Sequence, residues 1–163
     1  MSMIGNLVAL SPERLRSLID KPESVEEFLY PEDGDAEPDN HLDLDKTWHA
    51  IHFTLNGKAW EGEEPLFLTI LGGEEIGEDI GYGPARYLLP DQVRVVAQAL
   101  SSITPDDFAV KFDPSALAVA EIYPDIWSEG AEALEYVQSF YKDLRDFYIE
   151  ASERNDSVLI YLN

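Results

Sequence analysis

Short apolar runs near both ends of the chain predict buried strands. Residues 3–10 (MIGNLVAL) and 157–162 (SVLIYL) both have strand length, and the second run is rich in β-forming side chains. Residues 85–89 (ARYLL) predict one more strand. We expect the N-terminal and C-terminal strands to lie together in a central sheet that is covered by helices.

Most of the remaining apolar residues recur at helical spacing. Residues 90–103 and 129–154 each carry an apolar stripe along one helix face, and residues 22–29 predict a shorter helix. Further short helices are expected where a polar capping residue is followed by proline at the first helical position. These capping residues are Ser11, Thr104 and Asp113.

Two segments between these elements are less regular. Residues 42–57 predict one helix that ends at Asn56 and Gly57, because Leu44, Trp48, Ile51 and Leu55 follow the i, i+4, i+7 spacing. Residues 65–71 (PLFLTIL) fit a buried strand or a short helix, and we expect a helix with Pro65 in its first turn. The acidic, proline-rich residues 30–40 predict an exposed loop.

Charge is the strongest signal in the composition. The chain of 163 residues has 33 acidic and 11 basic side chains, a formal net charge of -22 and a pI near 4.1. Such a surface repels nucleic acid and anionic membranes, whereas it attracts a basic protein. The negative charge is also explained by solubility alone. We therefore expect no nucleic-acid or membrane partner, and a basic protein as the possible partner.

The absence of cysteine excludes disulfides and thiolate chemistry, and it fits a reducing cytoplasm. No run of residues has the length and hydrophobicity of a membrane span or the pattern of a signal peptide. We expect a cytoplasmic protein that forms one domain over residues 1–163.

A glycine-rich stretch over residues 72–83 resembles a phosphate-binding loop by glycine count. A Walker loop requires lysine followed by serine or threonine, and a dinucleotide fingerprint requires G-x-G-x-x-G between strand and helix. The stretch has neither pattern, and Glu74, Glu75, Glu78 and Asp79 would repel a phosphate. We therefore expect no cofactor, and a loop whose glycines supply positive φ angles.

Polar side chains form a ridge beside the apolar stripe of the helix predicted around Trp48. The ridge contains Asp45, His49, His52 and Asn56. His49 and His52 are neighbours at i and i+3, and Asp45 lies one turn from His49, which makes the three a weak candidate for a metal site or for a general base. A glutamate or histidine from elsewhere in the chain would be needed to complete a metal site, and no spacing in the sequence fixes one. In the structural interpretation, Asp45 pairs with His49, His52 is hydrogen-bonded at the edge of the core, and Asn56 helps to end the helix.

A second polar group lies in the glycine-rich stretch. Asp79, Tyr82 and Arg86 can form a cleft with His52, with His52 as a general base and Arg86 as a clamp for a carboxylate. The structural alternative for Arg86 is an ion pair with Glu78, Asp79 or Asp91. The first alternative describes an enzyme or a small-ligand-binding protein.

Three phrases in fixed order resemble the YfbM-like family of small bacterial proteins. They are LDKTWHAIHFTLNG, ILGGEEIGEDIGYGPARYL and EIYPDIW, followed by a long aromatic-rich helix and a final strand. The resemblance covers nearly the whole chain and implies one compact α/β domain of three layers. It implies no catalytic residue, because no activity is established for the family.

Together these patterns predict a helix-rich three-layer α/β/α-type domain with a small mixed central sheet. The function that we expect is a non-catalytic protein-interaction or binding module with a strongly acidic surface, of inhibitor or immunity type. The alternative is the enzyme or small-ligand-binding protein that uses His52, Asp79, Tyr82 and Arg86. No catalytic constellation is complete in the sequence, which leaves the question of an enzyme and the oligomeric state open.

Overall fold

A five-stranded antiparallel sheet forms the centre of the computed structural model, which describes residues 2–32 and 38–163. The strand order is β2-β1-β5-β4-β3, so the two end strands are neighbours, as predicted. The expected mixed sheet is wrong, because β5 lies between the parallel strands β1 and β4 and pairs antiparallel with both. The strands are β1 (Gly5–Leu10), β2 (His41–Asp43), β3 (Glu74–Asp79), β4 (Pro84–Leu88) and β5 (Ser157–Leu162).

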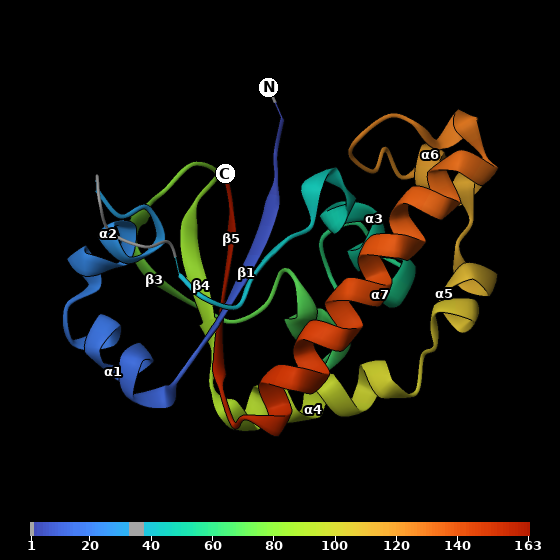
Figure 1. The fold of residues 1–163 in the computed structure, drawn as a ribbon. Helices are drawn as coiled ribbons and strands as arrows, with labels where there is room; N and C mark the ends of the chain where they lie inside the picture. The colour runs from blue at the N-terminus through green and yellow to red at the C-terminus, as the bar shows by residue number, and fades with distance from the viewer. Residues whose placement is uncertain (1, 33–37) are drawn as a thin grey trace.

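Helices cover both faces of the sheet and give three layers (Figure 1). One face carries α1 (Pro12–Asp20), the 3-10 turn η1 (Pro22–Ser24) and α2 (Val25–Leu29). The helix-rich α/β architecture predicted from the sequence is confirmed. The opposite side holds η2 (Asp45–Thr47), α3 (Trp48–Asn56), η3 (Leu66–Thr69), α4 (Pro90–Ser101), α5 (Pro105–Lys111), α6 (Pro114–Val119), η4 (Trp127–Glu129) and α7 (Ala131–Glu153).

The sheet divides the apolar side chains into two cores. Along β5, Val158 and Ile160 join the larger core under α3, α4 and α7, whereas Leu159 and Tyr161 join the smaller core under α1 and α2. This alternation follows from the period of two in a strand. Because both faces are covered, β1 and β5 are buried along almost their whole length, as their continuous apolar sequences predict.

The predicted caps are confirmed at three helix starts. The side chain of Ser11 accepts a hydrogen bond from the Arg14 amide at 3.1 Å, and Thr104 accepts one from Asp107 at 3.1 Å. Asp113 likewise caps α6. Helix α4 differs, because Leu89 occupies its N-cap position and no side chain caps the helix.

The single helix predicted over residues 42–57 is wrong in its first half. That part forms β2, which pairs with β1, and then η2, so α3 begins only at Trp48. Asp45 has a positive φ of 52°, which interrupts a helix at that point. The predicted end is confirmed, because Gly57 adopts the left-handed conformation with φ of 76°.

The glycine-rich stretch is a β-hairpin rather than one loop. Its acidic half forms the edge strand β3, which is paired with β4, and only residues 80–83 make the turn. Gly77, with φ of 77°, marks an irregularity in β3 and packs against the carbonyl oxygen of Pro22. Glycine permits both the positive φ and this close approach. The helical expectation for residues 65–71 is confirmed by η3. Part of the predicted loop at 30–40, residues 33–37, lies outside the described residues.

Candidate functional site

His49 is a structural member of the core. It is 2% exposed, and its ring packs against both Trp48 and Trp60, with centroid distances of 5.0 and 4.3 Å. Its Nδ1 accepts a hydrogen bond from the Tyr123 amide at 3.0 Å, and its Nε2 donates to the Ala59 carbonyl at 2.9 Å. Burial lowers the pKa of His49, although the bond to Ala59 opposes this. The neutral ring therefore connects α3 to two loops.

His52 is engaged in the same way, one turn further along α3. Its Nε2 donates to the Glu61 carbonyl at 3.0 Å, and its Nδ1 accepts from the amide group of Asn56 at 3.3 Å. Burial, helped by the charges of His49 and Arg86, lowers the pKa of His52 to about 4, although the bond to the Glu61 carbonyl opposes this. Neither nitrogen is free to take a proton from a substrate.

Asp45 does not join the histidines. The predicted pair between Asp45 and His49 is wrong, because Asp45 precedes α3 and its carboxylate accepts a hydrogen bond from the Tyr136 hydroxyl at 2.8 Å. Burial and this bond raise the pKa of Tyr136 to about 12. Within the described part of the chain, no group of three or more His, Cys, Asp or Glu side chains is placed to hold a metal ion.

Arg86 points from β4 toward the larger core. Its Nη1 donates to the Gly72 carbonyl at 2.9 Å, and no ion pair to it is found within residues 2–32 and 38–163, so the expected pair with Glu78, Asp79 or Asp91 is wrong. Those acids lie on the exposed edge strand and on α4. Burial lowers the pKa of Arg86, whereas nearby Tyr148 and Glu75 raise it.

Asp79 and Tyr82 lie at the exposed tip of the β3–β4 hairpin. The Asp79 carboxylate accepts hydrogen bonds from the Gly81 and Gly83 amides at 2.8 and 3.2 Å, which closes the turn. The Tyr82 side chain is 38% exposed, and its backbone amide contacts the Leu162 carbonyl. The structure thus brings Arg86 into electrostatic range of His52, while Asp79 and Tyr82 stabilise a turn.

The third histidine belongs to a polar cluster that the sequence patterns did not indicate. His41 Nε2 lies 2.8 Å from the Asn6 side-chain oxygen, and the His41 ring stacks on Tyr161. Asn6 also donates to Asn163, and Asn163 donates to the Tyr30 hydroxyl. These groups line a cavity of about 250 Å³ at one end of the sheet. Their mutual hydrogen bonds indicate a role in joining β1, β2 and β5.

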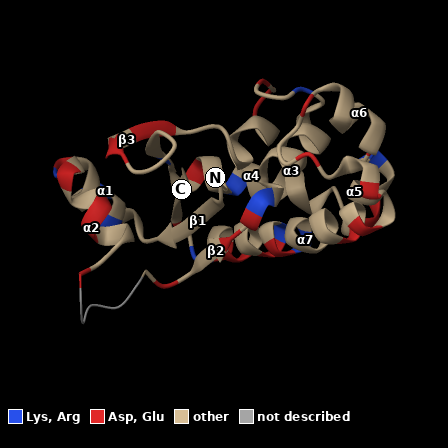
Figure 2. Cartoon of the chain, turned by 90° about the horizontal axis from the view of Figure 1, so that it is seen from above, with Lys and Arg blue, Asp and Glu red and all other residues tan. Residues whose placement is uncertain are grey.

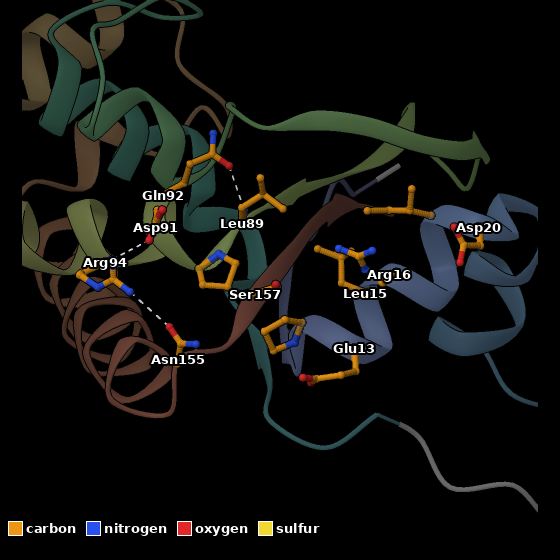
Figure 3. A pocket seen from close by; sticks show the side chains of 13 residues that line it. Glu13, Leu15, Arg16, Asp20, Leu89, Asp91, Gln92, Arg94, Asn155 and Ser157 are labelled. Atoms are coloured by element: carbon orange, nitrogen blue, oxygen red, sulfur yellow. Dashed lines mark hydrogen bonds and ion pairs between the residues drawn. The ribbon is translucent and has the colours of Figure 1, made fainter.

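A groove lies at the opposite end of the sheet, between α1 and α4 (Figure 3). It has a volume of about 820 Å³. Because β1 and β4 run parallel, their C-terminal ends meet at this edge, and each is followed by a helix on a different face. The groove is lined by residues from α1, the start of α4 and the start of β5.

Sequence patterns alone did not reveal this groove. It contains none of the histidines or glycines that attract attention, and its walls come from parts of the chain that are far apart in sequence. The sequence does contain one hint of the groove. Leu89 stands before Pro90 at the N-cap position, where the α-helices α1, α5 and α6, which also begin with proline, have a polar capping residue.

Comparisons with known proteins identify the fold and the family. The chain is similar to the crystal structure of YfbM from Escherichia coli, a protein of unknown function, with a TM-score of 0.74 and 20% sequence identity. The alignment covers 98% of this chain and 99% of the other. No curated protein matches, and no described helix has the length and hydrophobicity needed to cross a membrane. Residues 1–161 match the model of a domain of unknown function, DUF1877, and the chain therefore belongs to the DUF1877 family.

Proposed function

We propose that the protein is a non-catalytic binding module whose acidic surface binds a basic protein, and that it acts in the cytoplasm. One observation supports this proposal most directly: exposed carboxylates from three elements, η1, α2 and β3, lie side by side at the β3 edge of the sheet. We call this surface the acidic edge. It consists of Glu23, Glu26 and Glu27 from η1 and α2, and Glu74, Glu75, Glu78 and Asp79 from β3.

The two halves of the acidic edge are held together by packing. A Cβ atom at Gly77 would lie 3.1 Å from the Pro22 carbonyl oxygen and 3.4 Å from the Val25 Cβ. Figure 2 shows acidic residues on β3, α1 and α2 at this end of the molecule. In the described part of the chain, none of these carboxylates forms a salt bridge. Their charge therefore remains available to an incoming cation.

A surface of this kind acts mainly on the rate and selectivity of association. Uncompensated carboxylates attract a positively charged protein over a Debye length of about 8 to 10 Å at physiological salt. They also repel nucleic acid and anionic lipid. On an edge strand the same charges oppose pairing with the edge of another sheet. An inhibitor or immunity protein that covers a basic functional surface uses this type of complementarity.

The alternative, an enzyme or ligand-binding protein that uses His52, Asp79, Tyr82 and Arg86, rests on no comparable observation. Both ring nitrogens of His52 already have hydrogen-bond partners, and the Asp79 carboxylate closes a turn. We therefore give preference to the binding module.

The test compares two variants of equal net charge. The first neutralises the acidic edge with Glu26→Gln, Glu27→Gln, Glu75→Gln and Glu78→Gln. The matched control neutralises the same number of exposed acids on α7. Its substitutions are Glu132→Gln, Glu135→Gln, Asp143→Asn and Glu153→Gln.

Each protein is immobilised and exposed to a lysate of its host, and bound proteins are identified by mass spectrometry. We expect the wild type and the α7 variant to capture the same basic protein at 0.1 M salt, with about tenfold less captured by the acidic-edge variant. Capture should be lost at 0.5 M salt. Equal capture by the two variants, or capture that persists at 0.5 M salt, would contradict the proposal.

A further inference from the structure

We propose that the groove between α1 and α4 binds a small monocarboxylate with an apolar body. This site is independent of the acidic edge and of the proposed protein partner. The apolar body would lie along the groove, and the carboxylate would lie at the start of α4 above Ser157. At about 820 Å³, the groove is large enough for a small organic molecule.

The apolar part of the groove is formed by side chains that have no cover. Ile19 of α1 is 39% exposed and Leu89, just before α4, is 49% exposed, and the buried Leu15 lines the groove with them. Leu15 and Leu18 of α1 are buried, whereas the fold leaves Ile19 at the surface. Exposed apolar side chains that line one concavity indicate a binding groove more strongly than the same residues scattered over a surface.

Ser157 supplies the observation that indicates a polar ligand. The residue is 0% exposed, and its hydroxyl has no hydrogen-bond partner within the described residues. Ser157 begins β5 on the face that carries α1, and it lies at the floor of the groove (Figure 3). A buried hydroxyl without a partner has given up its hydrogen bonds to water and gained none in return, which lowers stability. A ligand oxygen that reaches the floor would remove this cost.

The start of α4 offers further donors beside Ser157. Leu89 cannot cap the helix, and Pro90 has no amide hydrogen, so the first free amides are those of Asp91 and Gln92. The structure shows no acceptor for either amide within the described residues. The Gln92 side chain instead accepts from the Leu89 amide at 2.8 Å. Free amides at a helix N-terminus bind anionic groups.

The charged side chains that line the groove favour a ligand with one negative charge over a ligand with two. Arg94 is held by Asp91 at 2.6 Å and by Asn155 at 3.2 Å, whereas Arg16 on the opposite wall has no partner in the described part of the chain. Glu13 and Asp20 also line the groove. A phosphate dianion would be repelled by these acids, whereas a carboxylate can bind Arg16 and the α4 amides with one charge.

The experiment is a titration of the 15N-labelled full chain with octanoate, in which binding is monitored through the amide chemical shifts. Two compounds serve as controls. Octanamide has the same alkyl chain without the negative charge, and inorganic phosphate has negative charge without an alkyl chain. We expect saturable shifts at Asp91, Gln92 and Ser157 with octanoate. The dissociation constant should be at least tenfold weaker for octanamide and for phosphate.

Variants connect the binding to the named groups. Ser157→Ala and Arg16→Gln should each weaken octanoate binding at least threefold. Thr69→Val, which removes another buried unpartnered hydroxyl from the larger core, should leave it unchanged. Because Arg16 is exposed, Arg16→Gln should fold normally. It therefore still tests the proposal if Ser157→Ala fails to fold. Absence of saturable shifts, equal affinity for octanamide, or wild-type binding by the folded variants would overturn the proposal.

Discussion

The α3 histidines and the groove between α1 and α4 use their polar groups in opposite ways. Both ring nitrogens of His49 and of His52 have hydrogen-bond partners, and both side chains are almost completely buried. In the groove, Ser157 is just as buried, yet its hydroxyl has no partner, and the first free amides of α4 lack an acceptor. The residue types that suggest chemistry in the sequence are engaged in the fold, whereas less conspicuous residues have the unused hydrogen-bonding capacity.

The difference shows why residue type alone is a weak guide to a binding site. His49 joins α3 to the loops at Ala59 and Tyr123 and so stabilises the fold. Both of its ring nitrogens are used in these bonds, so neither can bind a ligand. A serine hydroxyl that has no partner lowers stability until something binds it. Removing the groups from these two regions should therefore have opposite consequences.

The largest expected effect follows from His49→Phe. Phenylalanine keeps the stacking with Trp48 and Trp60 but leaves the Tyr123 amide and the Ala59 carbonyl without partners. We expect the free energy of unfolding, measured with urea, to fall by about 3 kcal/mol. His41→Phe is the matched control, because it keeps the stacking on Tyr161 and loses, at a more exposed site, the bond to Asn6 at 2.8 Å and a long contact with the Tyr161 hydroxyl at 3.5 Å; it should cost about 1 kcal/mol. Equal losses would contradict a special role for His49.

The second effect is a pH dependence that originates at His52. The pKa of His52 is about 4 in the folded protein, compared with 6.5 when unfolded. Between these values the unfolded state binds a proton that the folded state does not, so stability is complete above pH 6.5 and decreases as the pH falls toward 4. We expect a loss of about 2 kcal/mol from this residue by pH 4.5, after allowance for solvent screening.

His52→Gln isolates this contribution from the many carboxylates. The variant should have a smaller decrease in unfolding free energy between pH 6.5 and 4.5 than the wild type, with both measured in urea. Parallel curves for the two proteins would show that His52 does not titrate in this window.

A smaller effect, of opposite sign, is expected from Leu89→Ser. The substitution creates an S-P-D-Q sequence, in which the serine can cap α4 while Gln92 keeps its bond to the residue 89 amide. We expect a gain of about 1 kcal/mol in unfolding free energy and the loss of octanoate binding. Val95→Ser, on the same helix and 43% exposed, controls for loss of an exposed apolar side chain and should not stabilise. A destabilised Leu89→Ser protein would show that the α4 amides are already satisfied.

The smallest effect on stability is expected from Ser157→Ala. Its buried hydroxyl has no partner, so its removal relieves a desolvation cost and should raise the unfolding free energy slightly, by about 0.5 kcal/mol. Thr47→Val is the comparison, because the equally buried Thr47 hydroxyl donates to the Leu44 carbonyl at 2.6 Å. That variant should lose about 1 to 2 kcal/mol. If the two variants lose the same amount, Ser157 has a partner that the structure does not show.

Local signals in the sequence predicted much of the fold. Ser11, Thr104 and Asp113 marked helix starts correctly, and apolar periodicity located α4, α7 and β5. The errors arose where tertiary pairing overrides local pattern. Residues 41–43 pair with β1, and the acidic residues 74–79 pair with β4 despite their low β-propensity. Neither partner can be read from the segment itself.

The polar sites were harder to predict because they depend on contacts between distant segments. The helical spacing of His49 and His52 was evident, but their partners at residues 59, 61 and 123 come from loops whose path depends on the complete fold. Asp45 was assigned to the same helix, although its positive φ places it outside α3. The groove depends on the meeting of α1, α4 and β5, which no local spacing reveals.

The position of β5 also has a consequence for biosynthesis. It forms the middle of the sheet and pairs with β1 from Gly5 to Leu10, although almost the whole chain separates the two strands. While the ribosome is still adding the residues before Ser157, β1 and β4 cannot be joined, and the apolar side chains of β1 lack their neighbours. Contacts between such distant segments slow folding and prolong the exposure of apolar surface. Completion of the sheet must therefore wait until β5 has left the ribosomal exit tunnel.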